Sequence, residues 1–143
     1  GIMVAERIAG LDSGLNYGNI PNVIYTHPEI AWVGMSEDEL KKSETSYKEG
    51  SFPFSANGRA LTAGEASGIV KIYADASTDK ILGVQVFGPS ASELVQQALI
   101  AMDNGITSKK LGETVFSHPT VSEALHEANL SINERAIHIQ NKV

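Results

Sequence analysis

The amino-acid sequence predicts an α+β fold, in which helices pack against a mostly antiparallel β-sheet. Strand-like segments dominate the first part of the chain, whereas the two longest helical segments come after them. Two of the strand-like segments flank a short turn, as the strands of a hairpin do. Strands and helices do not alternate regularly, so parallel βαβ units are not favoured.

The length of 143 residues suits one domain with a sizeable hydrophobic core. Residues 1–10 have the apolar spacing of a helix and end at Gly10, but no N-cap residue precedes them. We therefore expect residues 1–16 to be the end of a preceding region and residues 17–143 to form the domain.

Three short strands are expected before the hairpin. Residues 23–25 form the first, which ends at His27-Pro28 because the residue before a proline is restricted to extended conformations. Residues 31–35 form the second strand and residues 47–54 the third. Pro53 has no N–H group to donate to a neighbour, so the third strand is expected at an edge of the sheet or ends there.

The hairpin is predicted from residues 69–74 and 80–87, which flank the turn-forming residues 75–79. Alternation in its first strand puts three apolar side chains on one face and two longer ones on the other: Val70, Ile72 and Ala74 against Lys71 and Tyr73. The second strand is apolar nearly throughout, which favours a central position in the sheet.

The helices are predicted from their first residues. A serine or threonine precedes a glutamate by three positions, the pattern of a capping box, at three places: Ser36 with Glu39, Ser90 with Glu93, and Thr120 with Glu123. The first box begins a short acidic helix that ends near Ser43, and the second begins a helix that stops at Asn104-Gly105. A short helix or turn is expected at residues 107–111.

The final helix is expected over about residues 120–135. Both long helices carry an apolar stripe at helical spacing, which predicts that each packs on the sheet. The stripes are Leu94, Val95, Ala98, Leu99 and Met102 in one, and Val121, Ala124, Leu125, Ala128 and Ile132 in the other.

Composition and motifs exclude several classes of function. The net charge of -6 and the pI near 5.1 argue against nucleic acid or an anionic membrane as a partner. No apolar run approaches the ~18 residues of a membrane span. The absence of cysteine excludes disulfides, zinc–thiolate sites and thiol chemistry of this chain's own. Glycine-rich phosphate-binding motifs, metal-ligand spacings of histidine and a G-x-S-x-G nucleophile are all absent, so neither a nucleotide site nor a metal site is expected.

His118 and Glu123 are the candidate catalytic residues. The structural interpretation is that Glu123 only caps the final helix together with Thr120. The functional interpretation is that Glu123 accepts a hydrogen bond from one ring nitrogen of His118 and leaves the other nitrogen free to move a proton. The spacing alone leaves both interpretations open, because pairs of histidine and carboxylate also occur in structural networks. For His27, the turn between two strands is favoured, and surface or interface positions are expected for His126 and His138.

The segment HPTVSEA at residues 118–124 resembles the C-terminal signature of the dihydrolipoamide dehydrogenases, within the pyridine nucleotide-disulfide oxidoreductase family. Three further segments are similar to the interface domain of that family: IYTHPEIAWVG at 24–34, FPFSANGRA at 52–60 and LGVQVFGP at 82–89. Residues 1–10 are similar to the last helix of its flavin-binding region. The resemblance therefore covers the chain from Gly1 to about Asn133.

This resemblance implies a homodimer that binds FAD and NAD and oxidises the dihydrolipoyl groups of 2-oxoacid dehydrogenase complexes through an active-site disulfide. It implies that His118 is the acid/base and that Glu123 holds it. A cis bond between His118 and Pro119 would aim the ring across the dimer interface, so that both residues approach the FAD of the partner subunit. Lipoyl domains are the implied partners, and the bacterial cytoplasm or the mitochondrial matrix the implied location.

The chain lacks the C-x-x-x-x-C pair and the dinucleotide fingerprint of that family. We therefore expect no bound FAD or NAD and no dehydrogenase activity in this chain alone. Two alternatives stay open: the interface domain of a sister reductase of the glutathione or mercuric type, and a purely structural dimerisation module.

Overall fold

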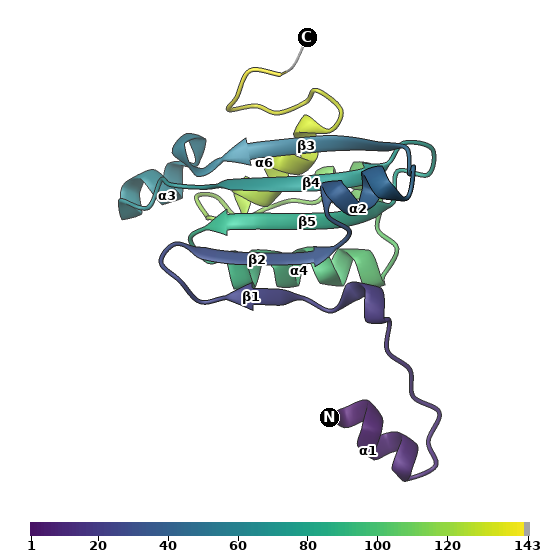
Figure 1. Ribbon diagram of the computed structural model, residues 1–143. Coiled ribbons are helices and arrows are strands. Elements are labelled where there is room, and N and C mark those ends of the chain that lie inside the picture. The colour runs from purple at the N-terminus through teal and green to yellow at the C-terminus, as the bar shows by residue number, and fades with distance from the viewer. Residues whose placement is uncertain (142–143) are drawn as a thin grey trace.

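Five antiparallel strands in the order β1-β2-β5-β4-β3 form one sheet in the computed structural model, which describes residues 1–141 (Figure 1). The strands are β1 (Asn22–Ile24), β2 (Glu29–Gly34), β3 (Tyr47–Pro53), β4 (Ile69–Asp75) and β5 (Ile81–Gly88). The helices are α1 (Ile2–Ile8), α2 (Glu37–Lys42), α3 (Gly58–Ala63), α4 (Ala91–Asp103), α5 (Ser108–Gly112) and α6 (Glu123–Ser131). Two short 3₁₀ turns, η1 (Tyr17–Asn19) and η2 (Phe54–Ala56), complete the elements.

The sheet confirms the predicted α+β class and the predicted hairpin. β4 and β5 pair antiparallel, with Val70 opposite Val86 and Ile72 opposite Val84. β5 is the middle strand of the five, as its continuous apolar sequence predicts. β3 lies at an edge and ends at Pro53, which has no N–H to donate to a further neighbour.

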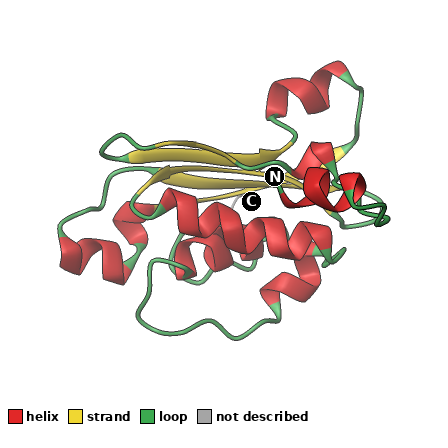
Figure 2. Cartoon of the chain, turned by 90° about the horizontal axis from the view of Figure 1, so that it is seen from below, coloured by secondary structure: helices red, strands yellow, loops and turns green. Residues whose placement is uncertain are grey.

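Helices α4 and α6 cover one face of the sheet (Figures 1 and 2). α4 packs on β2 and β5, whereas α6 packs on β3 and β4. Hydrophobic burial between these two layers holds the domain together. The residues that fill the space between the layers include Val33, Phe52, Val70, Ile72, Val84, Val86, Leu94, Val95 and Leu125, all at most 1 % exposed.

Gly50 allows α6 to lie close to the edge strand β3. A Cβ atom at this position would overlap the carbonyl oxygen of Ala128 and the side chain of Ile132. The Ser131 hydroxyl accepts a hydrogen bond of 2.8 Å from the Ser51 N–H in the same region. Close approach and this hydrogen bond together fix α6, and with it Glu123, relative to the sheet.

The opposite face of the sheet is only partly covered by other elements. α2 lies against this face (Figure 1), and Tyr73 is fully buried there beside Tyr47. The rest of the face forms an apolar cavity of about 470 Å³, lined by residues that include Ile30, Trp32, Ile69 and Phe87.

The N-terminal helix α1 stands apart from the sheet (Figure 1). It lies within the predicted helical segment, and its N-cap residue, Gly1, has no side chain that could cap it. None of its residues is buried, and Ile2 and Ile8 are largely exposed.

The three predicted capping boxes have three different outcomes. The Ser36–Glu39 box is confirmed with both of its reciprocal hydrogen bonds. The Ser90–Glu93 box is wrong, because Ser90 adopts a left-handed conformation with φ of 54° and makes no capping bond. Glu29 at the start of β2 caps α4 instead, since its Oε2 accepts hydrogen bonds from the N–H and hydroxyl of Ser92 at 3.1 and 3.0 Å.

The third box is half formed. Glu123 accepts a hydrogen bond from the Thr120 N–H, but the Thr120 hydroxyl donates to the Ser117 carbonyl and does not cap. α6 therefore begins at Glu123 and ends at Ser131, which is shorter than the predicted span of 120–135. The prediction also missed helix α3, whose N-cap is Asn57.

Candidate functional site

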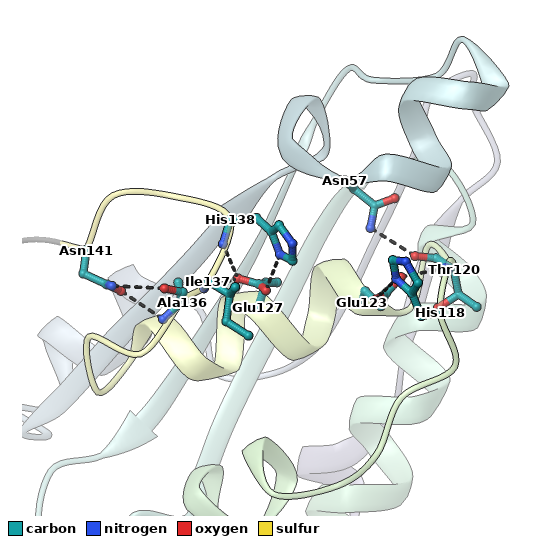
Figure 3. Close-up of polar contacts among 9 residues, drawn as sticks. All are labelled: Asn57, His118, Thr120, Glu123, Glu127, Ala136, Ile137, His138 and Asn141. Carbon is teal, nitrogen blue, oxygen red and sulfur yellow. Dashed lines mark hydrogen bonds and ion pairs between the residues drawn. The ribbon is translucent and has the colours of Figure 1, made fainter.

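The site lies where the loop after α5 meets the start of α6 (Figure 3). The His118–Pro119 peptide bond in this loop is cis, as the resemblance implies. The hydroxyl of Thr120 donates a hydrogen bond of 2.8 Å to the Ser117 carbonyl, which closes the chain into a tight turn. This turn brings the His118 ring back toward the first residue of α6.

Glu123 holds His118 through a hydrogen bond of 2.8 Å between Oε1 and Nδ1. Its other oxygen, Oε2, accepts a hydrogen bond of 2.8 Å from the Thr120 N–H. The Glu123 side chain is 22 % exposed, whereas the His118 side chain is 77 % exposed. Within residues 1–141, Nε2 of His118 makes no hydrogen bond, so this nitrogen faces solvent and is free to exchange a proton.

The charge of Glu123 suits this arrangement. Burial acts to raise the pKa of the Glu123 carboxyl, but hydrogen bonds from the Thr120 N–H and the His118 ring outweigh it and hold the pKa below its usual value. The carboxylate is therefore ionised at neutral pH. An ionised carboxylate on Nδ1 orients the imidazole and stabilises the imidazolium that forms when Nε2 takes a proton.

Asn57, which precedes α3, contacts the turn at Thr120 (Figure 3). Its Nδ2 donates a hydrogen bond of 3.0 Å to the Thr120 carbonyl, and its Oδ1 accepts one of 2.8 Å from the Ala60 N–H at the start of α3. The residue is only 3 % exposed. Asn57 thus links α3 to the Thr120 peptide, the Thr120 N–H binds Glu123, and Glu123 binds His118.

A second histidine–glutamate pair lies beside the first. Glu127 is one helical turn after Glu123 on α6, and its Oε1 is 2.8 Å from Nδ1 of His138. Glu127 is 4 % exposed and His138 remains largely exposed. Both pairs line one cavity of about 170 Å³, together with Phe52, Ala56, Asn57, Gly58 and Leu61.

The structure brings together His118 and Glu123, the two residues predicted from the sequence. The hydrogen bond required by the functional interpretation and half of the capping interaction required by the structural one are both present. His27 lies in the connection between β1 and β2, as predicted. His126 is part-buried, stacks on Phe116 and contacts the Gly112 carbonyl at 3.0 Å.

Two contributors to the site were missed from the sequence. Asn57 belongs to the family-like segment FPFSANGRA, and an asparagine is a favoured N-cap residue, which is the signal that could have indicated the start of α3. Glu127 was not singled out, although the spacing of four residues from Glu123 predicts that both carboxylates share one face of a helix. The contact between Glu127 and His138 depends on how the tail folds back, for which local spacing gives no signal.

Neither metal ligation nor a membrane span emerges from residues 1–141. No three histidine, aspartate or glutamate side chains in this range gather as a metal site would require. Among the same residues, no helix has the length and apolar character needed to cross a membrane.

Comparison with known proteins identifies the relatives of this chain. Residues 20–129 match the family model described as "Pyridine nucleotide-disulphide oxidoreductase, dimerisation domain". A dihydrolipoyl dehydrogenase of Cupriavidus necator is 48 % identical over 139 residues, which cover 97 % of this chain and 29 % of that protein. A mitochondrial dihydrolipoyl dehydrogenase of Caenorhabditis elegans is 46 % identical, over 92 % of this chain and 26 % of that protein. The chain thus spans less than a third of the length of these two curated relatives.

Solved structures show the same fold. The structure of LpdA from Mycobacterium tuberculosis superposes with a TM-score of 0.81 at 28 % identity, over 88 % of this chain and 28 % of that one. The HOCl-induced flavoprotein disulfide reductase RclA from Escherichia coli superposes with a TM-score of 0.82 over 90 % of this chain and 30 % of that one. Its identity of 24 % supports the fold alone.

Proposed function

This chain belongs to the pyridine nucleotide-disulphide oxidoreductase family as its dimerisation domain, and from that premise we propose that it supplies the acid/base pair of a dihydrolipoyl dehydrogenase. The observation that carries the proposal is the His118–Glu123 pair, with Nδ1 held at 2.8 Å and the ring otherwise exposed. The names of the relatives favour a dihydrolipoyl substrate over the substrate of a sister reductase.

His118 needs a second surface to act on. Its side chain projects from the domain, and this chain contains no cysteine that it could serve. In the proposed homodimer, His118 and Pro119 approach the FAD and the disulfide of the partner subunit. The exposed Nε2 fits this role because no group within residues 1–141 occupies it. The chain alone is expected to hold neither FAD nor NAD and to oxidise no dithiol.

The chemistry assigned to His118 is a proton transfer. An ordinary thiol, such as that of free cysteine with a pKa of about 8.5, is mostly protonated at neutral pH, and only the thiolate attacks a disulfide. Nε2 takes the proton from one substrate thiol, and the thiolate formed attacks the partner's disulfide to give a mixed disulfide and a released thiolate. The second substrate thiol gives its proton to the released enzyme thiolate, attacks the substrate sulfur of the mixed disulfide and displaces the other enzyme sulfur as a thiolate. The substrate is thereby oxidised to a disulfide, and the enzyme disulfide is reduced to a thiol and a thiolate, with the first proton held on His118. A bound FAD would supply the electron acceptor for this reduced enzyme, ahead of NAD⁺.

The test is His118→Gln in the full-length protein that carries this domain. We expect dihydrolipoamide oxidation to fall by about 100-fold or more, as is typical when a general base is lost, while the dimer and the flavin content stay unchanged. Unchanged turnover would favour a purely structural dimerisation module, and preference for glutathione over dihydrolipoamide in the unmodified protein would favour a sister reductase.

A further inference from the structure

Helix α6 holds two histidines through two carboxylates on one face. Glu123 and Glu127 are separated by one helical turn, and each also accepts backbone N–H groups from the segment that carries its histidine. The first segment enters the helix and the second is the C-terminal segment that follows it (Figure 3). The proposed proton transfer uses only the first pair, which leaves the second without a role.

Glu127 uses both of its carboxylate oxygens to hold the C-terminal segment. Its Oε2 accepts hydrogen bonds from the Ile137 and His138 N–H groups at 2.8 and 3.3 Å, and its Oε1 lies 2.8 Å from Nδ1 of His138. At 4 % exposure, this carboxylate depends on such partners, because burying an unpaired carboxylate is strongly unfavourable. All three contacts reach the same short stretch of the C-terminal segment.

The C-terminal segment is fastened around this point. The Asn141 side chain accepts a hydrogen bond of 3.0 Å from the Ala136 N–H and donates one of 3.1 Å to the Ala136 carbonyl, which closes residues 136–141 into a loop. Ala136 is buried, and Ile139 packs against the core. The loop therefore has its own internal bonds, and Glu127 is its polar attachment to α6.

The loop borders the His118 cavity at His138. His138 lines the same cavity of about 170 Å³ as His118 and Glu123, whereas Phe52, Ala56 and Leu61 give the cavity an apolar side. We propose that Glu127 is a positioning residue that holds residues 136–141 as one wall of the approach to His118, and that the wall admits the hydrocarbon portion of a dithiol. The identity of this occupant rests on the proposed function, whereas the attachment of the loop does not.

The attachment is tested on this chain by amide hydrogen exchange at Ile137 and His138. In Glu127→Ala, exchange at both amides is expected to accelerate more than about tenfold, because the hydrogen bonds that protect them are gone. Glu127→Gln keeps one acceptor oxygen and should recover part of this protection, which guards against a variant that merely unfolds. Glu134→Gln removes one negative charge from the exposed connection between α6 and the loop, as Glu127→Gln removes one from α6, and should leave exchange at both amides unchanged.

The role in the site is tested in the full-length protein by steady-state kinetics. Glu127→Ala is expected to raise KM for dihydrolipoamide about fivefold or more with kcat within about twofold, since His118 and Glu123 are untouched. The KM of Glu127→Gln for dihydrolipoamide should lie between the KM of Glu127→Ala and that of Glu134→Gln. Release of the loop with unchanged KM would overturn the wall, and equal exchange in Glu127→Ala and the unmodified chain would overturn the attachment. Retained turnover in His118→Gln would instead overturn the proposed function, whatever the exchange data show.

Discussion

Replacing Asn57 should loosen the His118 site from a distance, because Asn57 is the only side chain within residues 1–141 that hydrogen-bonds the Thr120 carbonyl. Asn57→Ala removes both functions of the amide. Loss of the N-cap of α3 costs about 0.5–2 kcal/mol, and leaving a part-buried carbonyl without a partner costs about 1–3 kcal/mol. We expect the free energy of unfolding of this chain to fall by about 1.5–5 kcal/mol, the sum of these two costs.

Asn57→Ser separates the two functions. Serine is as good an N-cap as asparagine, but its hydroxyl is too short to bind Ala60 and reach Thr120 at the same time. The free energy of unfolding of Asn57→Ser should therefore fall by only the cost of the unpaired carbonyl, about 1–3 kcal/mol, while the ring resonances of His118 shift as they do in Asn57→Ala. Thr107→Ala removes an N-cap from α5 and serves as the matched control, with a loss of about 1 kcal/mol and no effect on His118.

Urea unfolding at equilibrium measures the free energy of unfolding of each variant. NMR of the histidine rings shows whether the environment of His118 has changed. If Asn57→Ser matches the unmodified chain in both measurements, the contact with Thr120 contributes nothing. If Thr107→Ala shifts the His118 resonances as strongly as Asn57→Ser does, the shift follows from lost stability alone, and Asn57 does not position His118.

Three further predictions follow from the packing and charges. Gly50→Ala should destabilise the chain by about 1–3 kcal/mol in urea unfolding, because the new methyl group overlaps the carbonyl oxygen of Ala128; a loss under about 0.5 kcal/mol would contradict this packing. Glu29→Ala should cost about 1 kcal/mol, since the Ser92 N–H at the start of α4 loses its acceptor, and Glu93→Ala should be nearly neutral. The pKa of Glu123 is lowered in the folded chain, so its contribution to stability is complete above its ordinary pKa of 4.5 and is lost as the pH falls through the lower folded pKa. Glu123→Gln should therefore flatten the acid limb of the stability profile, and an unchanged limb would contradict the assigned ionisation.

Local patterns predicted most of the sheet and its helices. The β4–β5 hairpin follows from alternation and a turn within one short segment, and the edge position of β3 follows from one missing N–H at Pro53. The Ser90 cap failed because the acceptor that competes for the start of α4, Glu29, lies 63 residues away from Ser92. The capping-box pattern covers only four consecutive residues, so it cannot indicate a capping partner that comes from a strand far away in the sequence.

The functional site likewise combines a local contact, which the sequence predicts, with long-range contacts, which it does not. His118 and Glu123 are five residues apart and lie on either side of a proline, so a contact between them could be inferred from spacing. Asn57 contacts the Thr120 carbonyl across 63 residues, and His138 reaches Glu127 only after the chain folds back from the end of α6. Neither contact leaves a periodic trace in the sequence, because each depends on the packing of α3 or of the tail against α6.

The most direct test of the central claim, that this domain supplies half of an active site completed by a second subunit, is the activity of mixed dimers of the full-length protein. One variant carries His118→Gln, and the other has its disulfide cysteines replaced by serine; each alone is expected to be inactive. After equal mixing and re-association, half of the dimers carry both variants, and each of these has one intact composite site. Dihydrolipoamide oxidation should then return to about a quarter of the unmodified level, as random pairing in a twofold dimer requires. No recovered activity, in mixtures shown to contain hybrid dimers, would contradict the shared site.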